Sequence, residues 1–173
     1  MRRRVLYLDL DGTVRKGFDE LGRFVNGPDD VELFDGVAER IWRYRDGGYR
    51  VIAVSNQGGI ALGHMTLETC AAAMQKTQRL TRNGFDKIMF CRHHPQATDP
   101  EHAVCWCRKP RIGGLVETAL SLAAITAEFY PPHLALFVGD RPEDEQCAAN
   151  AGIPFMWAKD WRDHGEPLLR VGP

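Results

Sequence analysis

Five short apolar runs along the chain predict buried strands. They cover residues 5–8, 51–54, 88–90, 134–138 and 153–157, and each is too short to be an ordinary helix. These runs are apolar throughout and do not alternate with polar residues. Strands that are buried on both faces have this pattern, which is typical of a parallel sheet.

Segments with helical spacing separate these runs. Val37, Ile41 and Tyr44 recur at the interval of a helix face, and Gly47-Gly48 ends that pattern. The other predicted helices cover residues 66–83, 115–127 and 142–150. Thr66 is a suitable N-terminal cap for the first of these.

Three segments show neither pattern. Residues 18–28 are rich in turn residues, and we expect a small hairpin there. Residues 91–110 lack any useful period, and a loop of this length inside a compact domain needs something to organise it. The tail after residue 157 is expected to be irregular.

The alternation of buried strands with helices predicts an α/β fold, a three-layer Rossmann-like parallel sheet with helices on both faces. Right-handed crossovers place the carboxyl ends of such strands at one edge, where ligands bind. Polar residues follow three of the predicted strands. They are Asp9 with Asp11, Ser55 with Asn56, and Asp140, and we expect them to converge.

Length and composition narrow the class of protein. The 173 residues are close to the size of one domain, so we expect residues 1–173 to form a single folded unit. A net charge of −1 argues against a protein built to bind nucleic acid. Five cysteines, an odd number, do not favour a disulfide framework. We therefore expect a cytoplasmic protein with reduced thiols and no nucleic-acid partner.

The sequence also predicts that the protein does not enter or cross a membrane. No apolar stretch approaches the ~20 residues that a membrane helix needs. Asp9 and Asp11 interrupt the first apolar run, so we do not expect a signal peptide.

The three aspartates at the predicted edge indicate chemistry on a phosphoryl group. Asp9 and Asp11 are two apart, and such residues face the same side of an extended chain. Carboxylates gathered with Asp140 repel one another unless a cation such as Mg²⁺ lies between them. One carboxylate can attack phosphorus while its neighbour moves protons, and Ser55 and Lys109 can hold the transferring group. The alternative is that Asp9 and Asp11 are turn or cap residues beside Gly12.

A second set of residues predicts a structural zinc site in the loop of residues 91–110. Its members are Cys91, His93, Cys105 and Cys107, three sulfurs and one imidazole. Four such ligands complete a tetrahedral zinc site and leave no open position. The alternative is a set of buried thiols close together in sequence. We expect His94 and His102 to lie on the surface, and Cys70 and Cys147 to be core residues.

The two sets are adjacent in the chain, because Arg108 and Lys109 directly follow Cys107. A zinc-bound loop would therefore deliver both cations to the active edge. Arg108 and Arg141 are each candidates to bind a second phosphate or carboxylate of the substrate, since an arginine binds such groups through two parallel hydrogen bonds. The alternative for either arginine is an exposed charge without a partner.

Four motifs in order resemble those of the haloacid dehalogenase superfamily of phosphatases. They are Asp9-Leu10-Asp11-Gly12-Thr13, Ser55-Asn56-Gln57, Lys109, and Gly139-Asp140-Arg141-Pro142-Glu143-Asp144. The loop that ends in Cys105-Trp106-Cys107-Arg108-Lys109-Pro110 is similar to that of the branch with heptose bisphosphate and histidinol-phosphate phosphatases. Three places depart from this branch: Leu10, where it often has arginine; the stretch Val14-Arg15-Lys16, where it often has an asparagine; and Leu62, where it often has arginine.

The resemblance implies roles for these residues. Asp9 would be the nucleophile and Asp11 the general acid and base. The Asp9 side chain, the Asp11 backbone carbonyl and Asp140 would hold Mg²⁺, with Asp144 in support. Ser55, Asn56 and Lys109 would bind the phosphoryl group.

The resemblance further implies an open, capless enzyme that acts on a small phosphorylated metabolite, and we expect it to be a monomer. We predict a Mg²⁺-dependent phosphomonoesterase that forms an aspartyl-phosphate, acting on a sugar phosphate such as D-glycero-D-manno-heptose 1,7-bisphosphate, from which it removes the 7-phosphate. The alternatives are a histidinol-phosphate or nucleic-acid-end phosphatase and, from another class, an inactive zinc-stabilised binding module.

Overall fold

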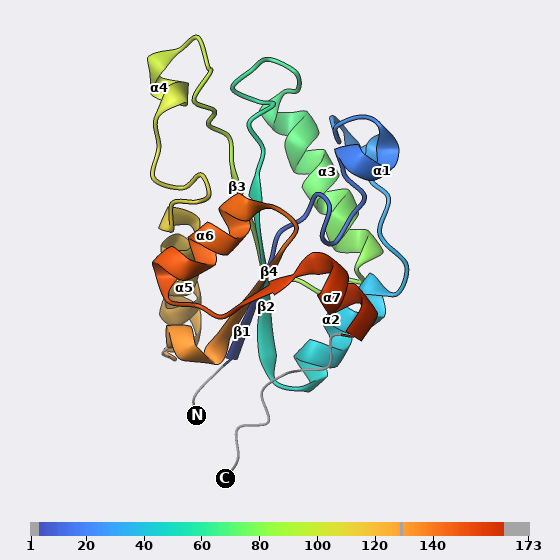
Figure 1. Cartoon of the computed structure of the whole chain (residues 1–173), viewed down its shortest axis with the longest axis vertical. Coiled ribbons are helices and arrows are strands. Elements are labelled where there is room, and N and C mark those ends of the chain that lie inside the picture. Colours follow the sequence, from blue (N-terminus) through green and yellow to red (C-terminus); the bar gives the residue numbers. More distant parts are fainter. Residues whose placement is uncertain (1–3, 129, 165–173) are drawn as a thin grey trace.

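The computed structural model describes residues 4–128 and 130–164, and its centre is a parallel sheet (Figure 1). The strand order is β3-β2-β1-β4-β5, and every neighbouring pair is parallel. The strands are β1 (Arg4–Leu8), β2 (Tyr49–Asn56), β3 (Lys87–Cys91), β4 (Ala135–Gly139) and β5 (Phe155–Trp157). All five strands predicted from the sequence are confirmed, with small changes at their ends.

Helices cover both faces of this sheet, as predicted. Side chains of β1 alternate between the faces, so that Leu6 and Leu8 lie in one core and Val5 and Tyr7 in the other. The first core is closed by α2 (Val37–Asp46), α3 (Leu67–Leu80) and α7 (Ala158–His164). The second is closed by α5 (Gly113–Thr126) and α6 (Pro142–Ala151). The architecture is therefore a three-layer α/β sandwich.

Local signals explain where the helices begin and end. Thr66 caps α3 by accepting a hydrogen bond from the Thr69 N–H at 3.1 Å. The helix ends at Leu80, earlier than predicted, because Arg82 and Asn83 adopt left-handed backbone conformations. Pro142 occupies the first turn of α6, a position where its missing N–H is no loss.

The hairpin predicted over residues 18–28 is wrong. This segment instead contains α1 (Phe18–Leu21) and leads into the short 3₁₀ helix η1 (Pro28–Asp30). The Glu20 side chain accepts a hydrogen bond from the Gly17 N–H at 2.8 Å, and Gly22 ends the turn in the left-handed conformation. These two caps stabilise a helical turn where we expected extended strands.

The irregular tail predicted after residue 157 is also wrong, since α7 forms there. Its Trp161 is fully buried among the residues of the first core. The helix has only seven residues. So short a helix is stabilised by packing more than by its own sequence preference, which explains why the pattern did not reveal it.

The remaining connections leave the carboxyl edge of the sheet open. Within the described residues, the segment from β1 to α2 holds only α1 and η1, and α3 alone joins β2 to β3. The loop after β3 contains α4 (Pro100–Ala103), and η2 (Pro132–Leu134) precedes β4. Neither of the first two connections carries a second sheet over the edge, as expected of a capless arrangement. No helix in the described part of the chain is long and apolar enough to span a bilayer.

Candidate active site

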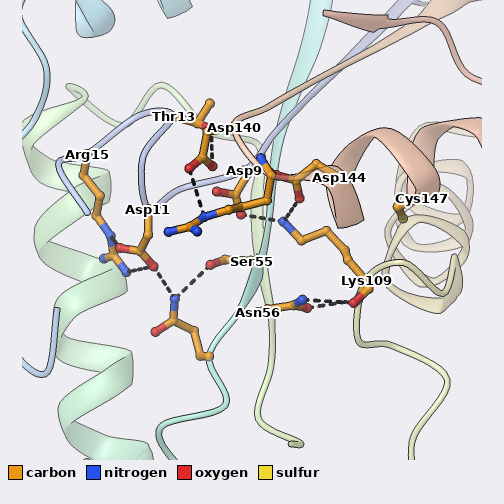
Figure 2. A network of polar contacts seen from close by, with 12 residues as sticks. Asp9, Asp11, Thr13, Arg15, Ser55, Asn56, Lys109, Asp140, Asp144 and Cys147 are labelled. Carbon is orange, nitrogen blue, oxygen red and sulfur yellow. Dashed lines mark hydrogen bonds and ion pairs between the residues drawn. The ribbon is translucent and has the colours of Figure 1, made fainter. Parts of the chain in front are cut away.

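The carboxyl ends of β1, β2 and β4 surround a cavity of about 470 Å³. Asp9 and Asp11 follow β1, Ser55 lies near the end of β2 and Asp140 follows β4, and all of them line the cavity. Figure 2 shows these side chains gathered at one edge from different strands. The structure thus brings together residues that the topology predicted to meet.

Lys109 reaches into this cluster as a buried cation. Its Nζ lies 2.5 Å from Asp9 Oδ1 and 2.6 Å from Asp144 Oδ1. All three side chains are almost entirely shielded from solvent. Asp144 is in the first turn of α6, where its other oxygen accepts a hydrogen bond from the Arg141 N–H at 3.1 Å. Helix α6, which follows β4, thus supplies the second carboxylate that pairs with Lys109.

Burial and mutual repulsion dominate the electrostatics of the carboxylates. Burial raises the pKa of Asp9 well above its ordinary value of 3.8, and the neighbouring Asp144, Asp140 and Asp11 add to the rise while Lys109 opposes it. Burial and the charge of Asp144 likewise raise the pKa of Asp140. Burial works against the charged form of Lys109, but Asp9 and Asp144 outweigh it and raise the pKa of Lys109. The cluster therefore has more negative charge than Lys109 balances.

The oxygen donors of this cluster fit a divalent cation. Asp9, Asp140 and Asp144 each offer a carboxylate oxygen, and these oxygens all lie within 4.8 Å of one another. Oxygen donors are the ligands that Mg²⁺ prefers. Gly12 leaves room for Asp140, because a Cβ built on Gly12 would lie 2.1 Å from Asp140 Oδ2. Thr13 donates a hydrogen bond to the other oxygen of Asp140 at 3.3 Å.

Asp11 lies beside this group, with its carboxylate held from behind. Arg15 donates to both of its oxygens, from Nε at 2.7 Å and from Nη2 at 3.2 Å. Gln57 donates from Nε2 to Asp11 Oδ2 at 2.7 Å, and the same Nε2 lies 2.8 Å from Ser55 Oγ. A third of the Asp11 side chain remains exposed, and the residue lines the cavity. Its carboxylate is thus fixed in place without being covered.

Asn56 holds the backbone of Lys109 in this arrangement. Its Nδ2 donates to the Lys109 carbonyl at 3.1 Å, and its Oδ1 accepts from the Lys109 N–H at 3.0 Å. Both ends of the amide are therefore occupied by the chain, although Asn56 also lines the cavity. Ser55 is buried and lines the same cavity. Ser55 and Asn56 thus have different partners. Asn56 bonds to the backbone of Lys109, whereas Ser55 Oγ lies close to Gln57 Nε2.

The four predicted zinc ligands come together in the loop after β3. The ligand atoms of Cys91, His93, Cys105 and Cys107 all lie within 4.8 Å of one another. Cys91 Sγ lies 3.6 Å from Cys105 Sγ and 3.2 Å from Cys107 Sγ, and none of these cysteines is in a disulfide. Zinc–sulfur bonds of about 2.3 Å imply sulfur–sulfur distances of about 3.8 Å in a tetrahedron. The cluster thus has the donor set and nearly the spacing of a closed zinc site.

This cluster connects directly to the cavity. The Arg108 N–H donates to Cys105 Sγ at 3.4 Å, and the Arg108 guanidinium donates to the His93 carbonyl at 3.1 Å. Arg108 lines the cavity next to Lys109. The loop with the predicted zinc ligands therefore holds Arg108, which precedes Lys109, and Asn56 holds the backbone of Lys109 itself.

Two further predicted positions differ in their surroundings. Arg141 is exposed at the cavity rim, 3.4 Å from Asp140 and 3.6 Å from Asp19. His94, expected at the surface, is half-buried beside Gly58 and lines the cavity. His102 is half-buried as well, with its ring 6.3 Å from that of His93. Cys70 and Cys147 are fully buried, as expected.

The sequence did not reveal several other residues of this site. Phe18 and Phe24 line the cavity from the segment expected to be a hairpin. Arg162 of α7 donates to the carbonyls of Gly12 and Thr13, at 2.7 and 3.1 Å. The Arg162 contacts have no local signal, since they join segments distant in sequence. Gln57 belonged to a recognised motif, but only the structure shows that it reaches Asp11.

Comparison with known proteins agrees with this fold and site. No family model matches the chain. It is 34% identical over 152 residues to a D-glycero-β-D-manno-heptose-1,7-bisphosphate 7-phosphatase of Salmonella typhi, an alignment that covers 86% of this chain and 76% of the relative. The enzyme of that name from Escherichia coli K12 is 33% identical, with coverage of 86% and 74%.

Solved structures give the same result. The D,D-heptose 1,7-bisphosphate phosphatase of B. bronchiseptica, crystallised with magnesium and phosphate, superposes with a TM-score of 0.72 and 29% identity over 88% of this chain and 78% of its own. A HAD-like phosphatase from Mesorhizobium loti superposes with a TM-score of 0.74 and 29% identity, covering 88% and 70%.

The fold and the site together define a phosphatase of the haloacid dehalogenase superfamily. Within that superfamily the chain belongs to the family of the heptose-1,7-bisphosphate 7-phosphatases.

Proposed function

We propose that this protein is a Mg²⁺-dependent phosphomonoesterase that removes the 7-phosphate of D-glycero-D-manno-heptose 1,7-bisphosphate through an aspartyl-phosphate intermediate. One observation carries the proposal. The Asp9 carboxylate is held 2.5 Å from the Lys109 ammonium at the floor of an open cavity, among carboxylates that can share a cation. The choice of substrate follows the names of the relatives, which are heptose bisphosphate phosphatases.

In the first step, an oxygen of Asp9 attacks phosphorus and the bond from phosphorus to the sugar oxygen breaks. Asp11 gives its proton to that oxygen, so that a neutral alcohol leaves. In the second step a water molecule attacks the phosphorus of the aspartyl-phosphate. Asp11 takes a proton from this water, and the Asp9 carboxylate is released together with inorganic phosphate.

The other residues of the cavity bind and position. Lys109 would stabilise the negative charge of the transferring group from its place beside Asp9. Ser55 would donate its hydroxyl hydrogen to a phosphoryl oxygen. Asn56, whose amide is bonded to the Lys109 backbone, would act by keeping Lys109 in register.

Mg²⁺ would be held by Asp9, Asp140 and the Asp11 backbone carbonyl, with Asp144 in support. When bound, the cation would neutralise the excess negative charge of the carboxylates and of the phosphoryl group. The carboxylates of the cluster otherwise face one another with Lys109 as their buried counter-charge.

The zinc ligands Cys91, His93, Cys105 and Cys107 would have a structural role. Four protein ligands fill a tetrahedral zinc site, so no position is left for substrate. Their contribution to function would be to order the loop that presents Arg108 and Lys109. Arg108 and, at the rim, Arg141 would bind a second anionic group of the substrate.

We further propose that residues 1–173 act as one folded unit, as a monomer in the cytoplasm, without a nucleic-acid or membrane partner. The net charge of −1 supports the lack of a nucleic-acid partner.

The decisive experiment compares wild-type protein with Asp9→Asn on a panel of phosphate esters. The panel includes heptose 1,7-bisphosphate, other sugar phosphates, histidinol phosphate, a 3′-phosphorylated oligonucleotide and p-nitrophenyl phosphate, all with Mg²⁺. We expect heptose 1,7-bisphosphate to have the highest kcat/KM and Asp9→Asn to lower every rate by more than about 10³-fold, since the covalent step is lost.

Each contrary result has a clear meaning. Wild-type rates in Asp9→Asn would exclude Asp9 as the nucleophile. A preference for histidinol phosphate or the oligonucleotide would replace the proposed substrate. No turnover on any ester by metal-loaded wild-type protein would favour the binding module instead.

A further inference from the structure

Arg15 is a fully buried arginine directly behind Asp11. Its side chain is 0% exposed, and it does not line the cavity that Asp11 faces. Nε and Nη2 bond to the two oxygens of Asp11, so the guanidinium grips the carboxylate through parallel hydrogen bonds. Within the described residues, Asp11 is the carboxylate that forms an ion pair with Arg15. Burying a charged guanidinium is costly, and this pairing offsets the cost.

A third contact anchors the Arg15 guanidinium to α3. Arg15 Nη1 donates to Thr77 Oγ1 at 3.0 Å, and that hydroxyl donates in turn to the Ala73 carbonyl within α3 at 2.9 Å. The Arg15 side chain is thus fixed at both ends, by its own catalytic loop and by a helix. Figure 2 shows it between α3 and Asp11.

The result is a carboxylate with a defined orientation. Arg15 and Gln57 donate three hydrogen bonds to Asp11, and of these two donors Arg15 does not line the cavity, whereas Gln57 does. A carboxylate that could rotate freely would present its oxygens to the substrate in many directions. Proton transfer requires the donor oxygen within hydrogen-bond reach of the leaving oxygen, so orientation matters for rate.

We propose that Arg15 is a positioning residue for proton transfer. By gripping Asp11 from behind, it aims the carboxyl group of Asp11 at the oxygen of the departing alcohol. Arg15 does not touch the substrate and acts only through Asp11. This inference rests on the proposed function, in which Asp11 protonates the leaving group as the bond to phosphorus breaks.

The chemistry of the leaving group provides the test. An alkyl ester releases a strongly basic alkoxide and needs the proton, whereas p-nitrophenyl phosphate releases a weakly basic phenolate and needs it little. The parameter kcat/KM extends only to the first irreversible step, which is departure of the alcohol. The ratio of kcat/KM between p-nitrophenyl phosphate and the best sugar phosphate of the panel therefore measures proton donation.

In Arg15→Met we expect kcat/KM on the sugar phosphate to fall by about 10²-fold, the lower range of a general-acid contribution. On p-nitrophenyl phosphate we expect a loss below about 5-fold, because the bond to phosphorus breaks without help there. Arg15→Lys keeps the charge but cannot grip both oxygens, and it should show an intermediate change of the ratio. Thr77→Val removes the outer anchor and should change the ratio in the same direction, by less.

Arg82→Met is the matched control, because Arg82 pairs with Glu39 at the surface, away from the cavity. Both of its kcat/KM values should equal those of wild type. Thermal unfolding of each variant identifies any that has lost its fold, and such a variant is left out of the comparison.

An equal loss on both esters in a folded Arg15→Met would mean that Arg15 has only a structural role. Were that variant unfolded, an unchanged ratio in both Arg15→Lys and Thr77→Val would overturn the proposal. If wild-type protein hydrolyses neither class of ester, the proposed function fails first, and the role of Arg15 falls with it.

Discussion

At the scale of single residues, the site depends on how close the groups of the catalytic loop approach one another. Lys109 is nearly fully buried between Asp9 and Asp144, a position in which a charge is tolerated only with partners. Asp140 is accommodated only because Gly12 has no side chain. The carboxylates and the lysine are therefore a single unit, in which moving one group moves the others.

Gly12→Ala should abolish most of the activity. Gly12 has a φ of +86°, and the new methyl group would meet Asp140 Oδ2 at 2.1 Å. Displacing a catalytic carboxylate by about 1 Å can cost about 10²-fold in rate, and we expect at least that loss of kcat/KM.

Gly48→Ala is the matched control. Its φ of +84° imposes nearly the same backbone strain, but a Cβ there would meet nothing within 4 Å. It should lose about 1 kcal/mol of unfolding free energy while its kcat/KM stays at the wild-type value. If both variants keep full activity, the clash with Asp140 has no functional weight.

At the scale of elements, the sequence predicted the strands and longer helices well because each has its own repeated pattern. The apolar runs revealed all five strands, and the parallel arrangement expected of them placed Asp9, Ser55 and Asp140 at one edge of the sheet. The short elements α1 and α7 were missed, since a helix of four or seven residues has too few positions to show a period.

The same limit applied to the contacts within the site. The identities of the site residues could be predicted from motifs, but the partners of Asp11 and Asn56 could not. Arg15 is four residues from Asp11, yet its anchor Thr77 is 62 residues further on, in α3. Such a contact depends on how a helix packs over the loop, which no local pattern contains.

We predict that a bound zinc orders the loop after β3, and Cys105→Ser tests this. Protein purified without added metal should contain about one zinc in wild type and less than about half an equivalent in the variant, since a structural site needs all its ligands. The kcat/KM of the variant should fall, because the Arg108 N–H bonds to Cys105 and Lys109 follows.

Cys147→Ala controls for the loss of a thiol, since Cys147 is a buried residue of α6 and is not part of the ligand cluster. Its zinc content should remain at the wild-type value. Elemental analysis of the three proteins decides the matter, and a full complement of zinc in Cys105→Ser would contradict the proposed site.

At the scale of the whole molecule, the carboxyl edge of the sheet is open, so we expect the segments that border the cavity to select the substrate. Phe18 and Phe24 are 45% and 64% exposed, and their rings pack 4.9 Å apart on one side of the cavity. Arg108 and His94 border the same cavity from the loop after β3. A ligand anchored at Asp9 would extend toward the Phe18 and Phe24 rings and toward the Arg108 guanidinium.

Phe24→Ala should therefore weaken binding of the sugar without changing the chemistry. We expect KM for the sugar phosphate to rise by about 5-fold with kcat unchanged, as when binding shared by ground and transition states is removed. The inhibition constant of inorganic phosphate, which reaches only the floor of the cavity, should not change. A fall in kcat with an unchanged KM would place Phe24 in the catalytic steps instead.

The position of β1 in the middle of the sheet has a consequence for local opening of the fold. β1 is hydrogen-bonded on one side to β2 and on the other to β4, while the three-residue β5 forms one border. Opening of a protein begins where few contacts must be broken, so the border strands can fray while the centre stays closed. The strand that leads into Asp9 is thus the last to separate, and brief opening at the borders leaves the proposed nucleophile in place.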